Sequence, residues 1–191
     1  MDVLSLLITT NVGISLRTCE QWLNGKKYTL GYQPKRKLPS TVTLKQILDT
    51  KPPNLYALRY GEIDDICVSV TIETEHGKVT TKNVPRAATG PDFKKMFIGS
   101  KGIYGEILEA TFRISPLPQK RQKMKLVWEL EKQKTEFLKK LWASGARPAV
   151  LQEARGRELV LVLEGHPEII GAEIKFLKKA CLETGMKWKN S

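Results

Sequence analysis

The chain has 191 residues, of which 41% are hydrophobic, and a formal net charge of +12. That length fits one large domain or two small ones, and the charge suits nucleic acid, an anionic membrane or an anionic cofactor. Cys19, Cys67 and Cys181 are odd in number and far apart, which excludes a disulfide framework and favours a reducing cytoplasm. The apolar run at residues 3–8 is too short to span a bilayer and lacks signal-peptide features. His76 and His166 lie in turn-like contexts, so no metal site is expected.

Short strands and helices are predicted for residues 1–84. Ser15 is typical of a helix N-cap. The apolar positions of the helix that follows, which ends at Gly25, are Leu16, Cys19, Trp22 and Leu23. The other predicted elements are a strand at 3–10, a loop at 28–39, a helix at 43–48, a strand at 65–74, a hairpin turn at 75–78 and a strand at 79–82. The loop carries Lys35, Arg36 and Lys37, which suit either a bound pyrophosphate or a solvated surface.

The most informative stretch of the sequence is residues 85–118, which read PRAATGPDFKKMFIGSKGIYGEILEATFRISPLP. They predict a short helix whose apolar face is Phe93, Met96 and Phe97, a glycine-punctuated loop, and an alternating strand from Glu106. Three glycines at every third position let the main chain approach a ligand, commonly a phosphate or a flat ring. The same spacing also occurs in simple tight turns. The three glycines are Gly99, Gly102 and Gly105.

After Pro118 the composition changes. Residues 119–123 are predicted as a polar, cationic linker, and six elements follow in the order β-α-β-β-α-β, which is the split βαβ, ferredoxin-like arrangement. The predicted ranges are 124–130, 131–144, 149–153, 158–164, 167–184 and 186–189. In the first helix we expect Phe137, Leu138, Leu141 and Trp142 to face inward.

The string at 85–118 resembles the flavin-binding domain of the vanillyl-alcohol-oxidase class of FAD-linked oxidases. That class includes alkylglycerone-phosphate synthase, D-lactate dehydrogenases and glycolate oxidase FAD subunits. Residues 59–65, RYGEIDD, are similar to the class motif R-Y-G-N-I-E-D. The positions of the longer string that match the class pattern in order are Pro85, Arg86, Thr89, Gly90, Pro91, Asp92, Gly99, Ser100, Gly102, Gly105, Glu109, Ala110 and Thr111.

The resemblance implies an α+β fold in which residues 1–118 are the second half of an FAD-binding domain and residues 119–191 are a ferredoxin-like piece of the substrate-covering cap. It implies FAD as the cofactor. The residues implied to contact FAD are Ser40, Thr41, Arg59, Tyr60, Gly61, Ile63, Gly99, Ser100, Gly102, Ile103, Gly105 and Ile107. No catalytic residue is assigned. The chain departs from the class pattern at Lys101, where an acidic residue is usual, and it lacks the glycine-rich pyrophosphate loop of the first half.

Three functions follow as hypotheses. The first is an FAD-binding oxidoreductase subunit or fragment that oxidises a 2-hydroxy-acid-like substrate when a second chain completes it. The second is a non-catalytic relic or assembly module of the same fold, which forms a homo-oligomer or binds a second subunit. The third, RNA binding through the β-α-β-β-α-β region, is disfavoured because residues 158–164, ELVLVLE, contain none of the aromatic side chains on which RNA-recognition motifs stack bases.

Overall fold

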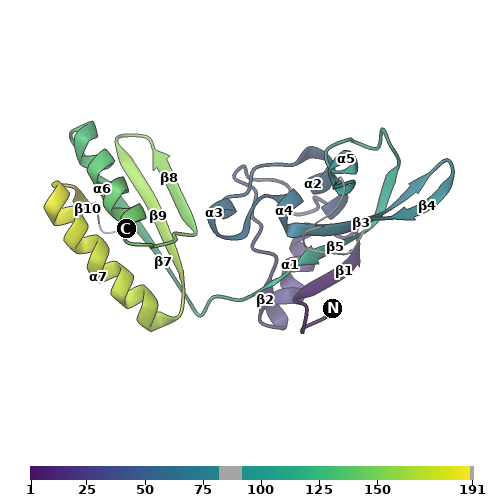
Figure 1. Ribbon diagram of the computed structural model, residues 1–191, viewed down its shortest axis with the longest axis horizontal. Helices are drawn as coiled ribbons and strands as arrows, with labels where there is room; N and C mark the ends of the chain where they lie inside the picture. The colour runs from purple at the N-terminus through teal and green to yellow at the C-terminus, as the bar shows by residue number, and fades with distance from the viewer. Residues whose placement is uncertain (82–91, 190–191) are drawn as a thin grey trace. The chain divides into compact units, whose positions relative to one another are not determined.

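The computed structural model describes residues 1–81 and 92–189 (Figure 1). The chain divides into two compact units, Met1–Leu117 and Pro118–Ser191, each with its own hydrophobic core. Both units mix helices and strands, in agreement with the α+β class expected from the sequence. Five of the matched positions, Pro85, Arg86, Thr89, Gly90 and Pro91, lie outside the described residues.

The first unit is built on an antiparallel sheet in the order β1-β5-β3-β4. Its strands are β1 (Leu7–Asn11), β5 (Glu106–Arg113), β3 (Cys67–Thr74) and β4 (Gly77–Thr80), and a separate pair joins β2 (Tyr28–Thr29) to β6 (Ser115–Pro116). The helices are α1 (Leu16–Gly25), α2 (Leu44–Thr50), α3 (Ala57–Tyr60), α4 (Ile63–Ile66) and α5 (Lys94–Phe97).

Local sequence accounts for the two longest helices of this unit. The Thr18 amide donates to the Ser15 side chain at 3.0 Å, which confirms Ser15 as the N-cap of α1. Helix α2 begins at a capping box, in which Thr43 accepts from the Gln46 amide and Gln46 accepts from the Thr43 amide. Its predicted inward residues, Leu44, Ile47 and Leu48, are fully buried.

Several predicted boundaries and faces were wrong. Strand β1 begins at Leu7 rather than at residue 3, because the Asp2 carboxylate accepts from the Leu4 and Ser5 amides and turns the chain. Trp22 is 47% exposed. In β5 the register against β3 shifts by one residue at Leu108. Ile107 and Ala110 therefore both face the core, although residues three apart in a regular strand would lie on opposite faces.

The apolar face predicted around Phe93 and Met96 was also wrong. Those side chains are 56% and 50% exposed, whereas Lys94 is buried. Its ammonium group donates to the Cys67 carbonyl at 2.7 Å, which satisfies the charge inside the fold. Helix α5 has only four residues, too few for a helical period to define a face.

The second unit confirms the predicted element order β-α-β-β-α-β. Its elements are β7 (Lys120–Val127), α6 (Glu131–Ala143), β8 (Val150–Ala154), β9 (Glu158–Gly165), α7 (Pro167–Thr184) and β10 (Lys187–Lys189). The antiparallel sheet has the order β10-β7-β9-β8, and α6 and α7 pack on one face of it (Figure 1). Trp142, predicted to face inward on α6, is 52% exposed.

The predicted linker at residues 119–123 is mostly strand. Lys120–Lys123 lies within β7 and pairs with the end of β9, where Arg121 faces Glu164. Their side chains form an ion pair with an N–O distance of 2.5 Å. Cross-strand pairing therefore extends β7 through residues whose polarity alone suggested a loop.

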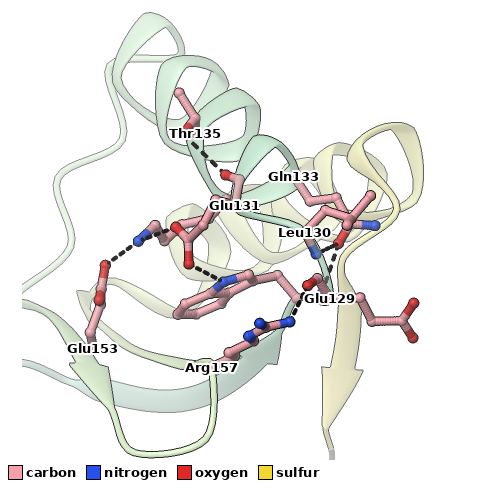
Figure 2. Close-up of polar contacts among 9 residues, drawn as sticks. Glu129, Leu130, Glu131, Gln133, Thr135, Glu153 and Arg157 are labelled. Carbon is pink, nitrogen blue, oxygen red and sulfur yellow. Dashed lines mark hydrogen bonds and ion pairs between the residues drawn. The ribbon is translucent and has the colours of Figure 1, made fainter.

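The junction between β7 and α6 is held by polar contacts (Figure 2). Lys134 bridges the carboxylates of Glu131 and Glu153, at 2.7 Å each, and lies over the Trp128 ring. The Gln133 side chain accepts from the Glu129 and Leu130 amides at 2.8 and 3.0 Å and donates to the Gly185 carbonyl at 3.0 Å. Gln133 thus ties the start of α6 to the end of α7.

We expect Gln133→Ala to lower the free energy of unfolding of the second unit by about 1–2 kcal/mol, because two helix-start amides lose their acceptor. Chemical denaturation followed by circular dichroism measures the change. Lys132→Ala, at an exposed position of the same helix, is the control and is expected to change stability by less than about 0.5 kcal/mol. Equal effects of the two substitutions would contradict the assigned role of Gln133.

Candidate flavin-binding surface

The glycine turn, Gly99–Gly105, connects α5 to β5. Gly99, Gly102 and Gly105 all have positive φ, at 89°, 83° and 133°, and Lys101 has a φ of 53°. The Ser100 amide donates to Phe97, Ile103 to Ser100 and Gly105 to Gly102. These three amides are satisfied within the protein and are not available as donors to a ligand.

The three glycines have different surroundings. A Cβ atom at Gly105 would lie 2.6 Å from the Glu73 carbonyl oxygen, so this glycine is required for packing on β3. A Cβ at Gly99 would meet the Lys51 side chain at 3.0 Å. At Gly102 nothing lies within 4 Å, and the neighbouring Ile103 and Tyr104 are 78% and 55% exposed. The open part of the turn is therefore Gly102–Tyr104.

Lys51 joins the glycine turn to α4. It ends α2 with a left-handed φ of 46°, and the Gly99 amide donates to the Leu48 carbonyl in the last turn of that helix at 2.9 Å. The Lys51 ammonium donates to the Asp64 carboxylate at 2.8 Å. Partial burial acts to raise the pKa of Asp64, but the hydrogen bond and charge of Lys51 outweigh it and hold that pKa below its ordinary value. The structure thus brings the turn and α4 together.

The predicted residues at 59–63 lie on α3 and α4. Arg59 is exposed, and its guanidinium lies 5.7 Å from the centre of the Tyr60 ring. The Tyr60 ring lies against Gly31, where a Cβ atom would be only 2.2 Å from it. Ile63 and the predicted residue of β5, Ile107, are buried in the core, so their side chains do not face a ligand at the surface.

Ser40 and Thr41 lie at the opposite end of α2 from the glycine turn. Both are exposed and precede the helix cap. A helix of seven residues is about 10 Å long, and nearby hydrogen bonds tie this end to the start of α1, through Leu16 and Val42. The structure does not bring Ser40 and Thr41 against Gly99–Gly105.

Sequence reasoning missed Lys51 and Asn54. Asn54 is fully buried and its side chain bonds to residues on both sides of it in the chain. In the sequence, Asn54 follows Pro52 and Pro53, which indicate only that regular secondary structure is interrupted there. That position gave no sign that the Asn54 side chain is buried. A cavity of about 320 Å³ between β1 and α1, lined by Ile8, Cys19 and Trp22 among others, contains none of the predicted FAD residues.

The three cysteine side chains are free thiols and are buried in the folded chain. Burial raises the pKa of Cys19 and Cys67 to about 12 and that of Cys181 to about 11. We expect a thiol reagent at about pH 8 to label them only after denaturant is added. Because an unfolded thiol ionises near 9.0 and the folded thiols stay neutral to higher pH, their contribution to stability is full below pH 9 and is lost as pH rises toward 12. Rapid labelling of the folded chain at about pH 8 without denaturant would contradict the predicted protection of these thiols.

Comparison with known proteins shows which enzymes this chain is similar to. No model of a protein family matches the chain. The chain is 28% identical over 189 residues to an uncharacterized FAD-linked oxidoreductase, YgcU, of Escherichia coli O157:H7, which covers 90% of this chain and 38% of that protein. It is 27% identical over 153 residues to the alkyldihydroxyacetonephosphate synthase of Caenorhabditis elegans, covering 80% of this chain and 25% of the synthase. The chain is therefore related in sequence to FAD-linked oxidoreductases and to alkyldihydroxyacetonephosphate synthases.

A solved structure shares the fold of this chain. An alkyldihydroxyacetonephosphate synthase structure matches with a TM-score of 0.81 at 18% identity, over 98% of this chain and 40% of the other. The family resemblance expected from residues 59–65 and 85–118 is therefore confirmed. The chain spans less than two fifths of the length of these curated relatives. Among the described residues, no helix is both long and apolar enough to cross a bilayer.

Proposed function

We propose that this chain binds FAD and contributes to an FAD-linked oxidoreductase that acts on a small 2-hydroxy-acid-like substrate. The observation that carries the proposal is the open main chain at Gly102, flanked by the exposed side chains of Ile103 and Tyr104, in a chain related to FAD-linked enzymes. A main chain without a Cβ can lie against a flat ring, and exposed apolar side chains can cover its edge.

Each part of the proposed site has a separate role. Gly102–Tyr104 would contact the ring, and Arg59 would place a positive charge near an anionic part of the cofactor. When bound, FAD would supply the redox chemistry by accepting the two electrons that leave the substrate on oxidation. Residues 1–118 would be the FAD-binding half, and residues 119–191 would be a ferredoxin-like cap piece.

The alternative is the same fold without tight flavin binding. Gly105 favours it, because packing against Glu73 explains that glycine without any ligand. Lys101 favours it too, since a cation stands where the class usually has an acidic residue. The two proposals differ in one measurable property, which is the affinity of the chain for FAD.

Calorimetric titration of the chain with FAD, with riboflavin and AMP in parallel, tests the proposal. We expect FAD and riboflavin to bind, because the open turn meets the ring system, and AMP to bind more weakly. The absence of FAD and riboflavin binding would overturn the proposed function and support the alternative. Binding of AMP alone would place the contact at the nucleotide end, away from Gly102–Tyr104, and would also overturn it.

A further inference from the structure

Asn54 is a buried hydrogen-bonding centre beside the proposed site. Its side chain has no exposed surface and uses its full set of partners. The amide oxygen accepts from the Gln33 and Tyr56 backbone amides at 2.9 and 3.1 Å. The amide nitrogen donates to the Gly31 and Gly61 carbonyls at 3.1 and 2.7 Å. One side chain therefore joins three separate segments of the first unit.

Other contacts hold the same three segments. The Asn54 backbone amide donates to the Glu62 carboxylate at 2.8 Å, and the Leu55 amide donates to the Gln33 carbonyl at 2.7 Å. The Tyr60 ring covers Gly31 so closely that no other residue fits there. Gly61 has a φ of 86° and a Cβ on it would lie 2.7 Å from Asp65. The backbone of Arg59–Gly61 is thus fixed from within the protein.

We propose that Asn54 is a positioning residue, which holds Arg59–Gly61 in the geometry that receives FAD before the cofactor arrives. This inference rests on the proposed function. Asparagine suits the position because it offers two donors and an acceptor on one short side chain. Aspartate has the same shape but presents oxygen atoms to the Gly31 and Gly61 carbonyls, and it would bring a buried charge next to Glu62.

The test uses the full chain with Asn54→Asp and Asn54→Ser, FAD as the probe, and hydrogen exchange of backbone amides. In Asn54→Ser the shorter side chain no longer supplies the acceptor of the Gln33 and Tyr56 amides, and we expect their exchange to rise by about tenfold or more. Asn54→Asp keeps an acceptor oxygen for these amides but loses the two donors to the Gly31 and Gly61 carbonyls. We expect FAD affinity to fall by about tenfold, because ordering the backbone of Arg59–Gly61 on binding costs free energy and so lowers the affinity. Asn54→Ser keeps a small polar group and serves if Asn54→Asp does not fold.

Gly31→Ala gives a second, independent variant, because the new methyl group would collide with the Tyr60 ring. Gly145→Ala is its matched control. The φ angles of the two glycines are 68° and 73°, and nothing lies within 4 Å of a Cβ at Gly145. We expect Gly31→Ala to weaken FAD binding by about tenfold and Gly145→Ala to leave it unchanged.

The outcomes separate this inference from the proposed function. If the unaltered chain binds no FAD, the proposed function fails first and the inference fails with it. If the unaltered chain binds FAD and the folded Asn54 and Gly31 variants bind it equally well, only the inference is overturned. Weaker FAD binding by these variants, with faster exchange at Gln33 and Tyr56 in Asn54→Ser, supports both.

Discussion

Replacing Gly105 by alanine is expected to lower the free energy of unfolding of the first unit by about 3 kcal/mol. An L-residue at a φ of 133° adds about 1–2 kcal/mol of backbone strain. The methyl group would also lie 2.6 Å from the Glu73 carbonyl oxygen and 2.7 Å from Ile72, and overpacking of this kind costs about 1–3 kcal/mol. Denaturant titration of the purified chain measures the change.

Gly77→Ala in the β3–β4 hairpin is the control for Gly105. Gly77 also has a positive φ, at 110°, but a Cβ there meets nothing within 4 Å. We expect it to lower stability by only about 1 kcal/mol. If both substitutions cost the same, the close approach of Gly105 to β3 does not exist in solution, and the glycine turn sits differently on the sheet.

Replacing Gly102 by alanine is expected to weaken FAD binding by about tenfold, or about 1.4 kcal/mol, while the fold persists. The new methyl group would stand between the main chain and the ring at the open part of the turn. Because a Cβ at Gly102 meets no protein atom within 4 Å, the effect on stability is limited to backbone strain of about 1–2 kcal/mol. Titration with FAD, followed by the change in visible flavin absorption, gives the affinity.

Gly156→Ala matches Gly102→Ala in strain but lies in the second unit. The φ angles are 82° and 83°, and neither Cβ would contact another residue. We expect Gly156→Ala to leave the FAD affinity unchanged. An equal loss of affinity in both variants would mean that strain, and not contact at the turn, weakens binding. An unchanged affinity in Gly102→Ala would remove the turn from the site.

Local patterns predicted most of the elements. The six-element order after Pro118 and the capped helices at Ser15 and Thr43 depend on periodicity and on residues close in sequence. The errors arose where distant residues decide the structure. Residues 120–123 form strand because they pair with β9, and Lys94 is buried because the Cys67 carbonyl accepts from it.

Only part of the candidate site could be proposed from the sequence. The glycine turn and Arg59–Gly61 are recognisable because their residues are contiguous and match a known class. Asn54 and Lys51 are not recognisable, because each acts on partners from several segments. The regular spacing of the three glycines suggested that all of them let the main chain approach a ligand. In the structure, Gly105 instead packs against β3, whereas nothing lies within 4 Å of a Cβ at Gly102.

Backbone hydrogen exchange with and without saturating FAD tests the central claim most directly. The account predicts slower exchange on FAD binding in two segments, Gly102–Tyr104 and Arg59–Gly61, with the lining of the β1–α1 cavity unchanged. Protection confined to that cavity, or no protection anywhere in the chain, would contradict it.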